Sequence, residues 1–277
     1  PVLLIALIPL ATNWSTASRR GETDARDFAH DLLNSVEPYA VLVTAGDNDT
    51  FPLWYAQEVE GVRRDVLVVN NMLLNTDWHL RQVIRRRVDE YDGASGPALF
   101  SSLARTRPAG SVTSLSEGEA EQLPPYQVLT QRMTFASGGL RAVIDPARLP
   151  QAGNGAGYLD RGDLALLRMI ADSWPARPVY FARTTGDQAA RLGLAPYLVS
   201  EGLVRRLVPP AEAVSRQVID TSGGRVDLAL QSRNGAVAID VADTGPGMGV
   251  RWRAGSAGAT SKAPAILSGR CRRLSGS

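Results

Sequence analysis

The chain has 277 residues and is 44% hydrophobic, so it can bury a substantial core in one or two domains and is not a disordered protein. Its formal net charge is only +2, and all but one of its 30 basic residues are arginine. No basic stripe with interleaved aromatic residues occurs, which argues against a nucleic-acid partner, and the run from Arg85 to Arg87 is typical of a solvated helix face. One cysteine and two histidines exclude a disulfide framework, a cysteine-based metal site and a multi-histidine metal centre.

The first residues are almost wholly apolar. Residues 1–11 carry no charged side chain, and a helix that spans a bilayer needs about 20 such residues. Two interpretations are open: the stretch is a buried strand of a soluble domain, or it is the last part of a transmembrane helix that begins further upstream. Trp14, which follows the apolar run, suits a membrane interface.

Three short apolar stretches, over residues 40–44, 65–71 and 179–182, predict strands of a buried sheet. The helical spacing of apolar residues predicts four helices around them. These helices cover residues 25–35, the stretch after Gly46 that Gly61 closes, a segment capped by Thr76 or Asp77 that stops near residues 91–93, and residues 163–174 with Asp163 as a cap. Two successive strand–helix units imply a parallel pair of strands joined by a right-handed crossover.

Residues 93–157 have a different composition. Gly, Pro and Ser dominate and periodicity is short-lived, which predicts a long irregular insertion. Two short strands are expected within it, around residues 131–136 and 140–144. The expected fold class is therefore α/β, a small and mostly parallel sheet flanked by helices over residues 13–210, interrupted by this insertion.

Polar residues follow the predicted strands at the points where they end. In open parallel sheets, ligands bind beyond the carboxyl ends of the strands, where helix N-termini point free N–H groups. The sequence therefore predicts a polar edge that is the candidate ligand-binding site. Its members are Asp47, Asn48, Asp49, Asn70, Asn71 and Thr184.

Three interpretations of the acidic turn at residues 47–49 are open. In the first, Asp47 or Asp49 caps the following helix and Asn48 fills the turn, which stabilises the fold by about 1 kcal/mol. In the second, Asp47 and Asp49 hold Mg²⁺ or Mn²⁺ beside a sugar nucleotide, because hard cations prefer oxygen ligands. In the third, the edge binds a glycan or another acceptor without a metal.

A set of motifs within residues 1–210 resembles a known family. The motifs are GDNDTFPLWY from Gly46 to Tyr55, QEVEG from Gln57 to Gly61, LLNT from Leu73 to Thr76 followed by Trp78, RPVYFA from Arg177 to Ala182, and EGLV from Glu201 to Val204. Together they resemble the carboxyl-terminal part of a family of multi-pass bacterial membrane proteins of unassigned function. That family is similar to the eukaryotic transmembrane protein O-mannosyltransferases.

The resemblance implies that residues 1–12 are the end of a transmembrane helix, and that an N-terminal part outside this chain anchors it to the membrane. It implies a bacterial inner-membrane protein whose soluble part faces the periplasm. In this class of glycosyltransferase the donor is a polyprenyl-linked sugar, and the catalytic acid lies in an early extracytoplasmic loop. No residue here matches that acid, so the fragment is expected to be inactive alone even where the parent protein is an enzyme.

Residues 223–248 resemble the ATP-binding box of histidine kinases, in which a strand delivers Asp-x-Gly-x-Gly. Asp243, Gly245 and Gly247 match that box and are the candidate nucleotide-binding residues. The helix that should bind Mg²⁺ and the second glycine-rich lid have no counterpart in this sequence. We therefore expect a β-hairpin that pairs residues 226–230 with 236–241, within a poorly defined segment over residues 211–277 that ends in a disordered tail.

The expected function is that of a soluble extracytoplasmic domain of a membrane glycosyltransferase-like protein, which binds an acceptor or glycan or braces the membrane core. The acceptor is a glycan or a polypeptide. Three alternatives stay open. They are a metal-dependent sugar-nucleotide transferase that uses Asp47 and Asp49, a nucleotide-binding fragment that uses Asp243, and a purely structural module.

Overall fold

The computed structural model describes residues 5, 7–94, 96–101, 103, 105–153 and 155–209, together with the backbone of three strands between residues 215 and 243. Its centre is a five-stranded sheet with the strand order β2-β1-β7-β9-β8. The strands are β1 (Val41–Thr44), β2 (Leu67–Asn70), β7 (Val179–Ala182), β8 (Leu198–Glu201) and β9 (Val204–Leu207). β1 is parallel to both β2 and β7, whereas β9 is antiparallel to β7 and β8. The predicted α/β class is confirmed, and so is the parallel centre of the sheet.

Two layers of helices cover the sheet, which is why its central strands are apolar on both faces. Helices α3 (Asp24–Asn34) and α4 (Asp47–Glu58) pack with Leu42 and Tyr180 in one core cluster. Helices α5 (Asp77–Arg85) and α8 (Arg161–Ser173) pack with Val43 and Phe181 in the other. Neighbouring residues of one strand thus pack in the core clusters on opposite faces of the sheet. Every residue of β1, β2 and β7 is buried.

The strand pair β8–β9 is joined by a tight turn in which Gly202 has φ +62°. Glycine adopts this backbone conformation without a steric penalty, and it is the first central position of the turn that favours twisted hairpins. The same device recurs in the irregular insertion, where Gly138 and Gly139 both have positive φ between β4 (Met133–Ser137) and β5 (Leu140–Ile144). The two short strands predicted there are confirmed, since β4 and β5 pair antiparallel.

The insertion holds more structure than the sequence predicts. Strand β3 (Tyr126–Leu129) pairs antiparallel with β6 (Gly157–Asp160), which begins 28 residues after β3 ends. This pairing closes the part of the insertion between the two strands into a loop that lies against α8. Short helices α6 (Ala98–Ser101), α7 (Glu117–Glu121) and α9 (Gln188–Arg191) also belong to this part of the chain, with single 3₁₀ turns at Leu73–Asn75, Pro146–Arg148, Arg183–Thr185 and Ala195–Tyr197.

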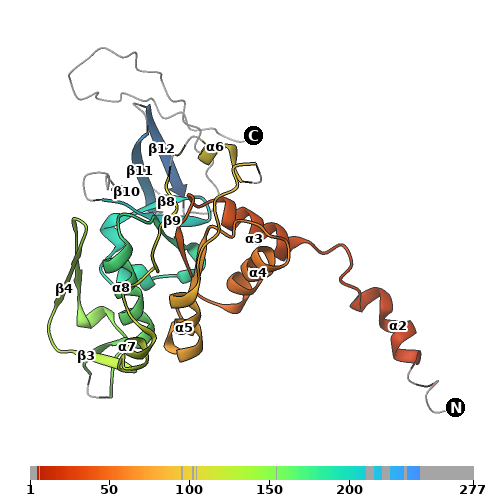
Figure 1. The fold of residues 1–277 in the computed structure, drawn as a ribbon, viewed down its shortest axis with the longest axis horizontal. Coiled ribbons are helices and arrows are strands. Elements are labelled where there is room, and N and C mark those ends of the chain that lie inside the picture. The colour runs from red at the N-terminus through yellow and green to blue at the C-terminus, as the bar shows by residue number, and fades with distance from the viewer. Residues whose placement is uncertain are drawn as a thin grey trace.

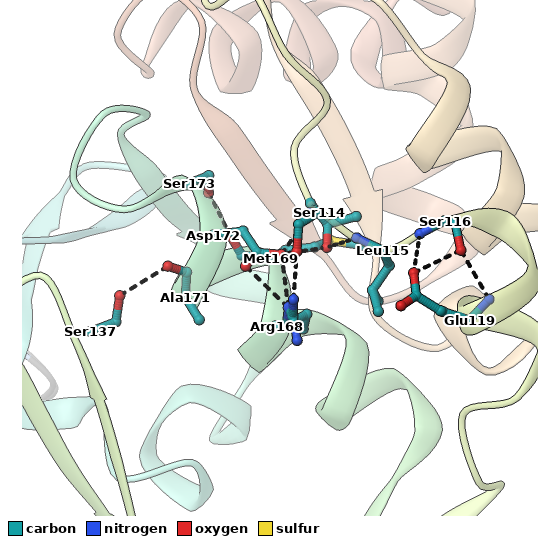
Figure 2. Close-up of polar contacts among 11 residues, drawn as sticks. Ser114, Leu115, Ser116, Glu119, Ser137, Arg168, Met169, Ala171, Asp172 and Ser173 are labelled. Carbon is teal, nitrogen blue, oxygen red and sulfur yellow. Dashed lines mark hydrogen bonds and ion pairs between the residues drawn. The ribbon is translucent and has the colours of Figure 1, made fainter.

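One carboxylate ties this insertion to the core, as Figure 2 shows. Asp172 Oδ2 near the end of α8 accepts hydrogen bonds from the hydroxyl of Thr113 (2.8 Å) and from the backbone N–H (2.7 Å) and hydroxyl (2.9 Å) of Ser114. Arg168, one turn earlier, donates its Nε to the same carboxylate at 2.9 Å. Burial raises the pKa of Asp172, but the hydrogen bonds from Ser114, Thr113 and Arg168 outweigh it, and the net pKa is lowered.

A buried arginine joins α3 to the start of β2. Arg63 forms a bidentate pair with Asp65 (2.8 and 3.0 Å), and its Nη1 donates to the carbonyls of Leu33 (2.9 Å) and Val36 (3.0 Å). Asp65 also accepts the backbone N–H of Tyr39 at 3.1 Å. Each polar atom of this buried pair therefore has partners, as a desolvated ion pair requires.

The start of α8 corrects one prediction. The N-cap is Asp160, whose side chain accepts the N–H of Asp163 at 2.8 Å, so Asp163 is not the cap but lies inside the first turn. Asp163 is 2% exposed, and burial together with the nearby Asp160 raises its pKa.

The two ends of the chain differ. Helix α2 (Leu7–Ala17) stands apart from the domain in Figure 1 and buries none of its residues, so Leu7, Ile8 and Leu10 are more than half exposed. Within the described residues, no helix has the length and apolarity needed to cross a membrane. At the other end, β10 (Ser215–Ile219), β11 (Arg225–Arg233) and β12 (Ala236–Asp243) form an antiparallel sheet.

The predicted C-terminal hairpin is present, with Leu230 opposite Ile239 and Val226 opposite Asp243. The predicted tail beyond it, including Gly245 and Gly247, lies outside the described residues.

Candidate functional site

The carboxyl ends of the parallel strands bring three of the predicted site residues together. Thr44 is paired with Asn70 across β1 and β2, and Asp49 follows β1 in the first turn of α4. Thr184, in the 3₁₀ turn directly after β7, donates its hydroxyl to Asp49 Oδ2. Residues that are far apart in sequence therefore meet at one edge of the sheet, as parallel pairing requires.

The carboxylate of Asp49 is committed to internal hydrogen bonds. Oδ1 accepts the N–H of Gly46 (2.9 Å) and the hydroxyl of Thr50 (3.1 Å), and Oδ2 accepts the N–H of Ala45 (3.0 Å) and the hydroxyl of Thr184. Asp49 is 2% exposed. A carboxylate has about four lone-pair positions, so these four donors fill them. Asp49 thus holds the strand-to-helix turn from within, as the third residue of a capping box whose N-cap is Gly46, so neither Asp47 nor Asp49 is itself the N-cap.

Asn70 extends this network to the neighbouring strand. Its amide Nδ2 donates to Thr50 Oγ1 (2.8 Å) and to the carbonyl of Gly46 (3.3 Å), while its Oδ1 accepts the N–H of Leu73 (2.9 Å). Thr50 Oγ1 in turn lies 2.7 Å from Thr44 Oγ1. Thr44 and Thr50 are fully buried members of the network that the sequence analysis did not single out.

The other predicted residues have separate surroundings. Asp47 and Asn48 are exposed at the start of α4, and neither side chain forms a hydrogen bond or ion pair with another described residue. Asn71 is 8% exposed and its N–H donates to the carbonyl of Thr44 at 2.9 Å, but its Oδ1 has no hydrogen-bond partner among the described residues. The polar edge therefore has a buried, structural part around Asp49 and Asn70, and an exposed part formed by Asp47 and Asn48.

His79 covers the outer side of β2, the edge strand. Its Nε2 lies 3.3 Å from the N–H of Asn70, and its Nδ1 lies 3.2 Å from Gln82 Oε1. This geometry is that of a neutral imidazole with its proton on Nδ1, because Nε2 must accept. Burial lowers the pKa of His79, and the hydrogen bond to Gln82 only partly opposes that effect. The neutral ring satisfies a strand N–H that would otherwise be open to another chain.

Aromatic side chains gather beside this edge. Trp54 lies between Phe51 (ring centroids 5.5 Å apart) and His79 (5.6 Å), and Trp78 packs against the other side of His79 (5.3 Å). Phe51 and Trp78 are each 49% exposed. We call Phe51, Trp54 and Trp78 the aromatic shelf. Asp47 lies one turn before Phe51 on α4, so the exposed carboxylate and the shelf share a helix face.

The shelf was recognisable in the sequence only as helix periodicity. Phe51 and Trp54 have helical spacing in the stretch after Gly46, and Trp78 has it in the stretch after Asp77. This spacing does not bury Phe51 and Trp78, which are each 49% exposed. The signal that distinguishes them is the density of three large aromatic residues within the first turns of two successive helices.

The same geometry is relevant to the hypothesis that Asp47 and Asp49 hold Mg²⁺ or Mn²⁺. Asp49 has no acceptor position left for a metal ion, and Asp47 is exposed. Among the described residues, no group of three or more His, Cys, Asp or Glu side chains is placed to hold a metal. The arrangement can offer hydrogen bonds and flat apolar surface to a ligand.

A family model described as TMEM260-associated domain 2 matches residues 25–102 and 141–229, which together make up more than half of the chain. The matched ranges contain the whole polar edge and the aromatic shelf, and they leave out most of the irregular insertion and Asp243. No curated protein and no solved structure matches the chain significantly. None of these comparisons supports the resemblance to O-mannosyltransferases or to the histidine-kinase box.

Proposed function

The chain belongs to the TMEM260-associated domain 2 family, and from this premise we propose that it is the extramembrane part of a larger glycosyltransferase-like membrane protein, where it binds a glycan or polypeptide acceptor. The proposed site is the exposed part of the polar edge with the aromatic shelf. The family description itself associates the domain with a membrane protein. The proposed location of the domain is the periplasmic side of a bacterial inner membrane.

The observation that carries the proposal is the position of the shelf. Phe51 and Trp78 are each 49% exposed, and Phe51 lies on α4 one turn after Asp47 and Asn48, which are exposed as well. Flat apolar surface with a few hydrogen-bonding groups at its rim is the usual composition of a small-molecule site, and exposed tryptophan provides such a surface with little loss of conformational freedom. Sugar rings offer the matching combination of apolar faces and hydroxyl groups.

Helix α2 supports the membrane part of the proposal. All of its described large apolar side chains are exposed, and none packs on the domain. A bilayer is the environment in which such a surface costs no free energy. We propose that α2 continues a membrane segment, and that the catalytic groups and the polyprenyl-linked sugar belong to the parent protein, so this chain alone has no transferase activity.

Calorimetric titration tests the binding proposal. The probes are a threonine-containing peptide that carries an α-mannosyl group, the same peptide without the sugar, and methyl α-mannopyranoside. We expect saturable binding of at least one probe, weakened tenfold or more, about 1.4 kcal/mol, in Trp78→Ala and in Phe51→Ala. Tyr126→Ala is the matched control, since Tyr126 is 57% exposed on β3 and lies outside the shelf. Unchanged affinity in both shelf variants would refute the site.

One observation favours a second function: groups of the chain itself fill all four hydrogen-bond acceptor positions of the Asp49 carboxylate. A buried carboxylate whose four acceptor positions are filled is what a structural brace requires. In that case the three probes give no heat with the unaltered chain, while Asp49 variants lower the melting temperature. The two functions therefore predict different results in the same titration.

A further inference from the structure

A second region of the molecule is built differently from the polar edge. A cavity of about 590 Å³ lies between the end of α5 with the residues after it and the segment over residues 107–111. It shares no lining residue with the polar edge or the aromatic shelf. Its charged lining consists of five arginines and one glutamate, namely Arg85, Arg86, Arg87, Arg107, Arg177 and Glu117.

Two of these arginines already have acidic partners. Arg85 pairs with Glu117, and Arg86 pairs with Glu58 at 2.8 Å. Arg87 and Arg107 are exposed, and neither forms a hydrogen bond or ion pair with any described residue. The cavity therefore keeps a surplus of positive charge after its internal pairs are formed.

Arg177 is the unusual member, because it is a buried cation without a described counter-charge. Its side chain is 5% exposed, and one guanidinium nitrogen, Nη2, donates to the carbonyl of Gly110 at 2.7 Å. The other terminal nitrogen, Nη1, is buried and has no partner among the described residues. Burial lowers the pKa of Arg177. An uncompensated buried charge is strongly destabilising, so a group that supplies negative charge here would be favoured.

The cavity wall is held in place by several hydrogen bonds. Ser111 Oγ donates to the carbonyl of Ile84 at 3.0 Å, and Arg177 fixes Gly110. Immediately beyond this wall, Thr113 and Ser114 donate hydrogen bonds to Asp172; Figure 2 shows Ser114 beside Asp172. The segment that carries Arg107 is therefore fastened to α5 and to α8, which keeps the arginines facing one space.

We propose that this cavity binds a phosphate group, with Nη1 of Arg177 as the buried donor and the side chains of Arg87 and Arg107 as the outer ones. Guanidinium groups match the oxygen atoms of phosphate in geometry, and several of them converging on one point suit a dianion better than a single carboxylate. The volume exceeds that of the bare ion, so the phosphate is part of a larger molecule. This site does not depend on the function proposed for the polar edge.

The test uses the full chain and four probes at low ionic strength. Calorimetry measures binding of inorganic phosphate, pyrophosphate and citrate, and co-sedimentation measures binding to phosphatidylcholine vesicles with and without phosphatidic acid. Saturable pyrophosphate binding supports a soluble phosphate ligand, and binding only to the phosphatidic acid vesicles supports a lipid headgroup. Absence of both overturns the proposal, and so does citrate binding as tight as pyrophosphate binding, because that result assigns the site to carboxylates.

Single variants distinguish specific binding in this cavity from general attraction of the anionic probes to the positive charges of the chain. Arg87→Ala and Arg107→Ala should each weaken binding about fivefold or more without loss of fold, since neither side chain has a described partner. Glu117→Gln should strengthen binding several-fold, because it removes the one acidic group in the lining and releases Arg85. Arg148→Ala, an exposed arginine outside the cavity, should change nothing.

Equal weakening in Arg148→Ala, or no strengthening in Glu117→Gln, contradicts the proposal. Arg177→Gln should abolish binding, and its thermal melt shows whether it still folds. If it does not fold, the decision rests on the Arg87, Arg107 and Glu117 variants.

Discussion

Thr184 donates its hydroxyl to the carboxylate of Asp49 although the two residues are 135 positions apart, so the turn after β7 is fastened to the turn after β1. This contact closes the ring of four donors around Asp49. It also determines what Asp49 can do, because a carboxylate with no free acceptor position organises the edge of the sheet and leaves ligand contacts to its exposed neighbours.

The first prediction concerns this pair. Asp49→Asn keeps the size of the side chain but replaces one acceptor oxygen with a donor, so it should lower the free energy of unfolding by about 2 to 4 kcal/mol. Thr184→Val removes one of the four donors and should cost about 1 to 2 kcal/mol. Urea unfolding of both single variants and the double variant measures the coupling, which should be about 1 kcal/mol or more. Strictly additive losses would show that the two side chains do not interact.

The second prediction is a loss of stability in mild acid. Because burial lowers the pKa of His79 below the value of about 6.5 for an exposed histidine, the unfolded chain takes up a proton that the folded chain does not. The contribution of His79 is therefore complete above pH about 6.5 and is lost as the pH falls through that value toward the folded pKa. Melting temperatures recorded between about pH 8 and pH 5, the interval in which histidine titrates, measure this loss of stability.

The variant that checks this prediction is His79→Gln, which should flatten the acid limb of the stability curve. A limb as steep as that of the unaltered chain would assign the effect to carboxylates.

The third prediction concerns the buried pair of Arg63 and Asp65. Arg63→Lys keeps the charge but loses the bidentate contact and the bonds to two carbonyls, so it should cost about 2 to 4 kcal/mol. Arg64→Lys is the matched control in the next position, where Arg64 pairs with Asp89 and both side chains are about half exposed. It should cost less than about 0.5 kcal/mol. Similar losses in both variants, measured by chemical unfolding, would contradict the role given to Arg63.

The fourth prediction concerns the anchor of the insertion. Asp172→Asn removes a charged acceptor from Thr113, Ser114 and Arg168, so cleavage by a protease within residues 105–125 should become faster at neutral pH. Because the net pKa of Asp172 is lowered, its contribution is present above the unfolded value of about 3.9 and is lost as the pH falls through the folded pKa.

Asp187→Asn provides the comparison, because Asp187 also pairs with an arginine one turn away but is exposed and binds no loop. Its cleavage rate should equal that of the unaltered chain. Equal acceleration in the two variants would mean that Asp172 does not hold the insertion.

The sequence was a good guide to the elements whose signal is local. Continuous apolar stretches predicted β1, β2 and β7, and because strands of one parallel sheet end at one edge, the meeting of Asp49, Asn70 and Thr184 could be inferred before any coordinates. The two short strands β4 and β5 were likewise predicted close to their observed positions.

What the sequence did not reveal depends on contacts between distant segments. The filling of Asp49's acceptor positions needs the hydroxyls of Thr50 and Thr184 in three dimensions, and no pattern announces it. Phe51 and Trp78 have helical spacing, but periodicity identifies a helix face without showing whether another layer covers it, and both side chains are about half exposed. The arginine cavity joins Arg87, Arg107 and Arg177 from three separate segments.

The exposed shelf gives the most direct test of the proposed function. Trp54 and Trp78 lie in the shelf, whereas Trp174 is buried in the core, so the chain carries its own internal reference. In ¹H–¹⁵N spectra recorded during a titration with the mannosylated peptide, we expect the indole N–H signals of Trp54 and Trp78 to shift in a saturable manner while that of Trp174 stays in place. Stationary signals from both shelf tryptophans, or an equal shift of Trp174, would contradict the account.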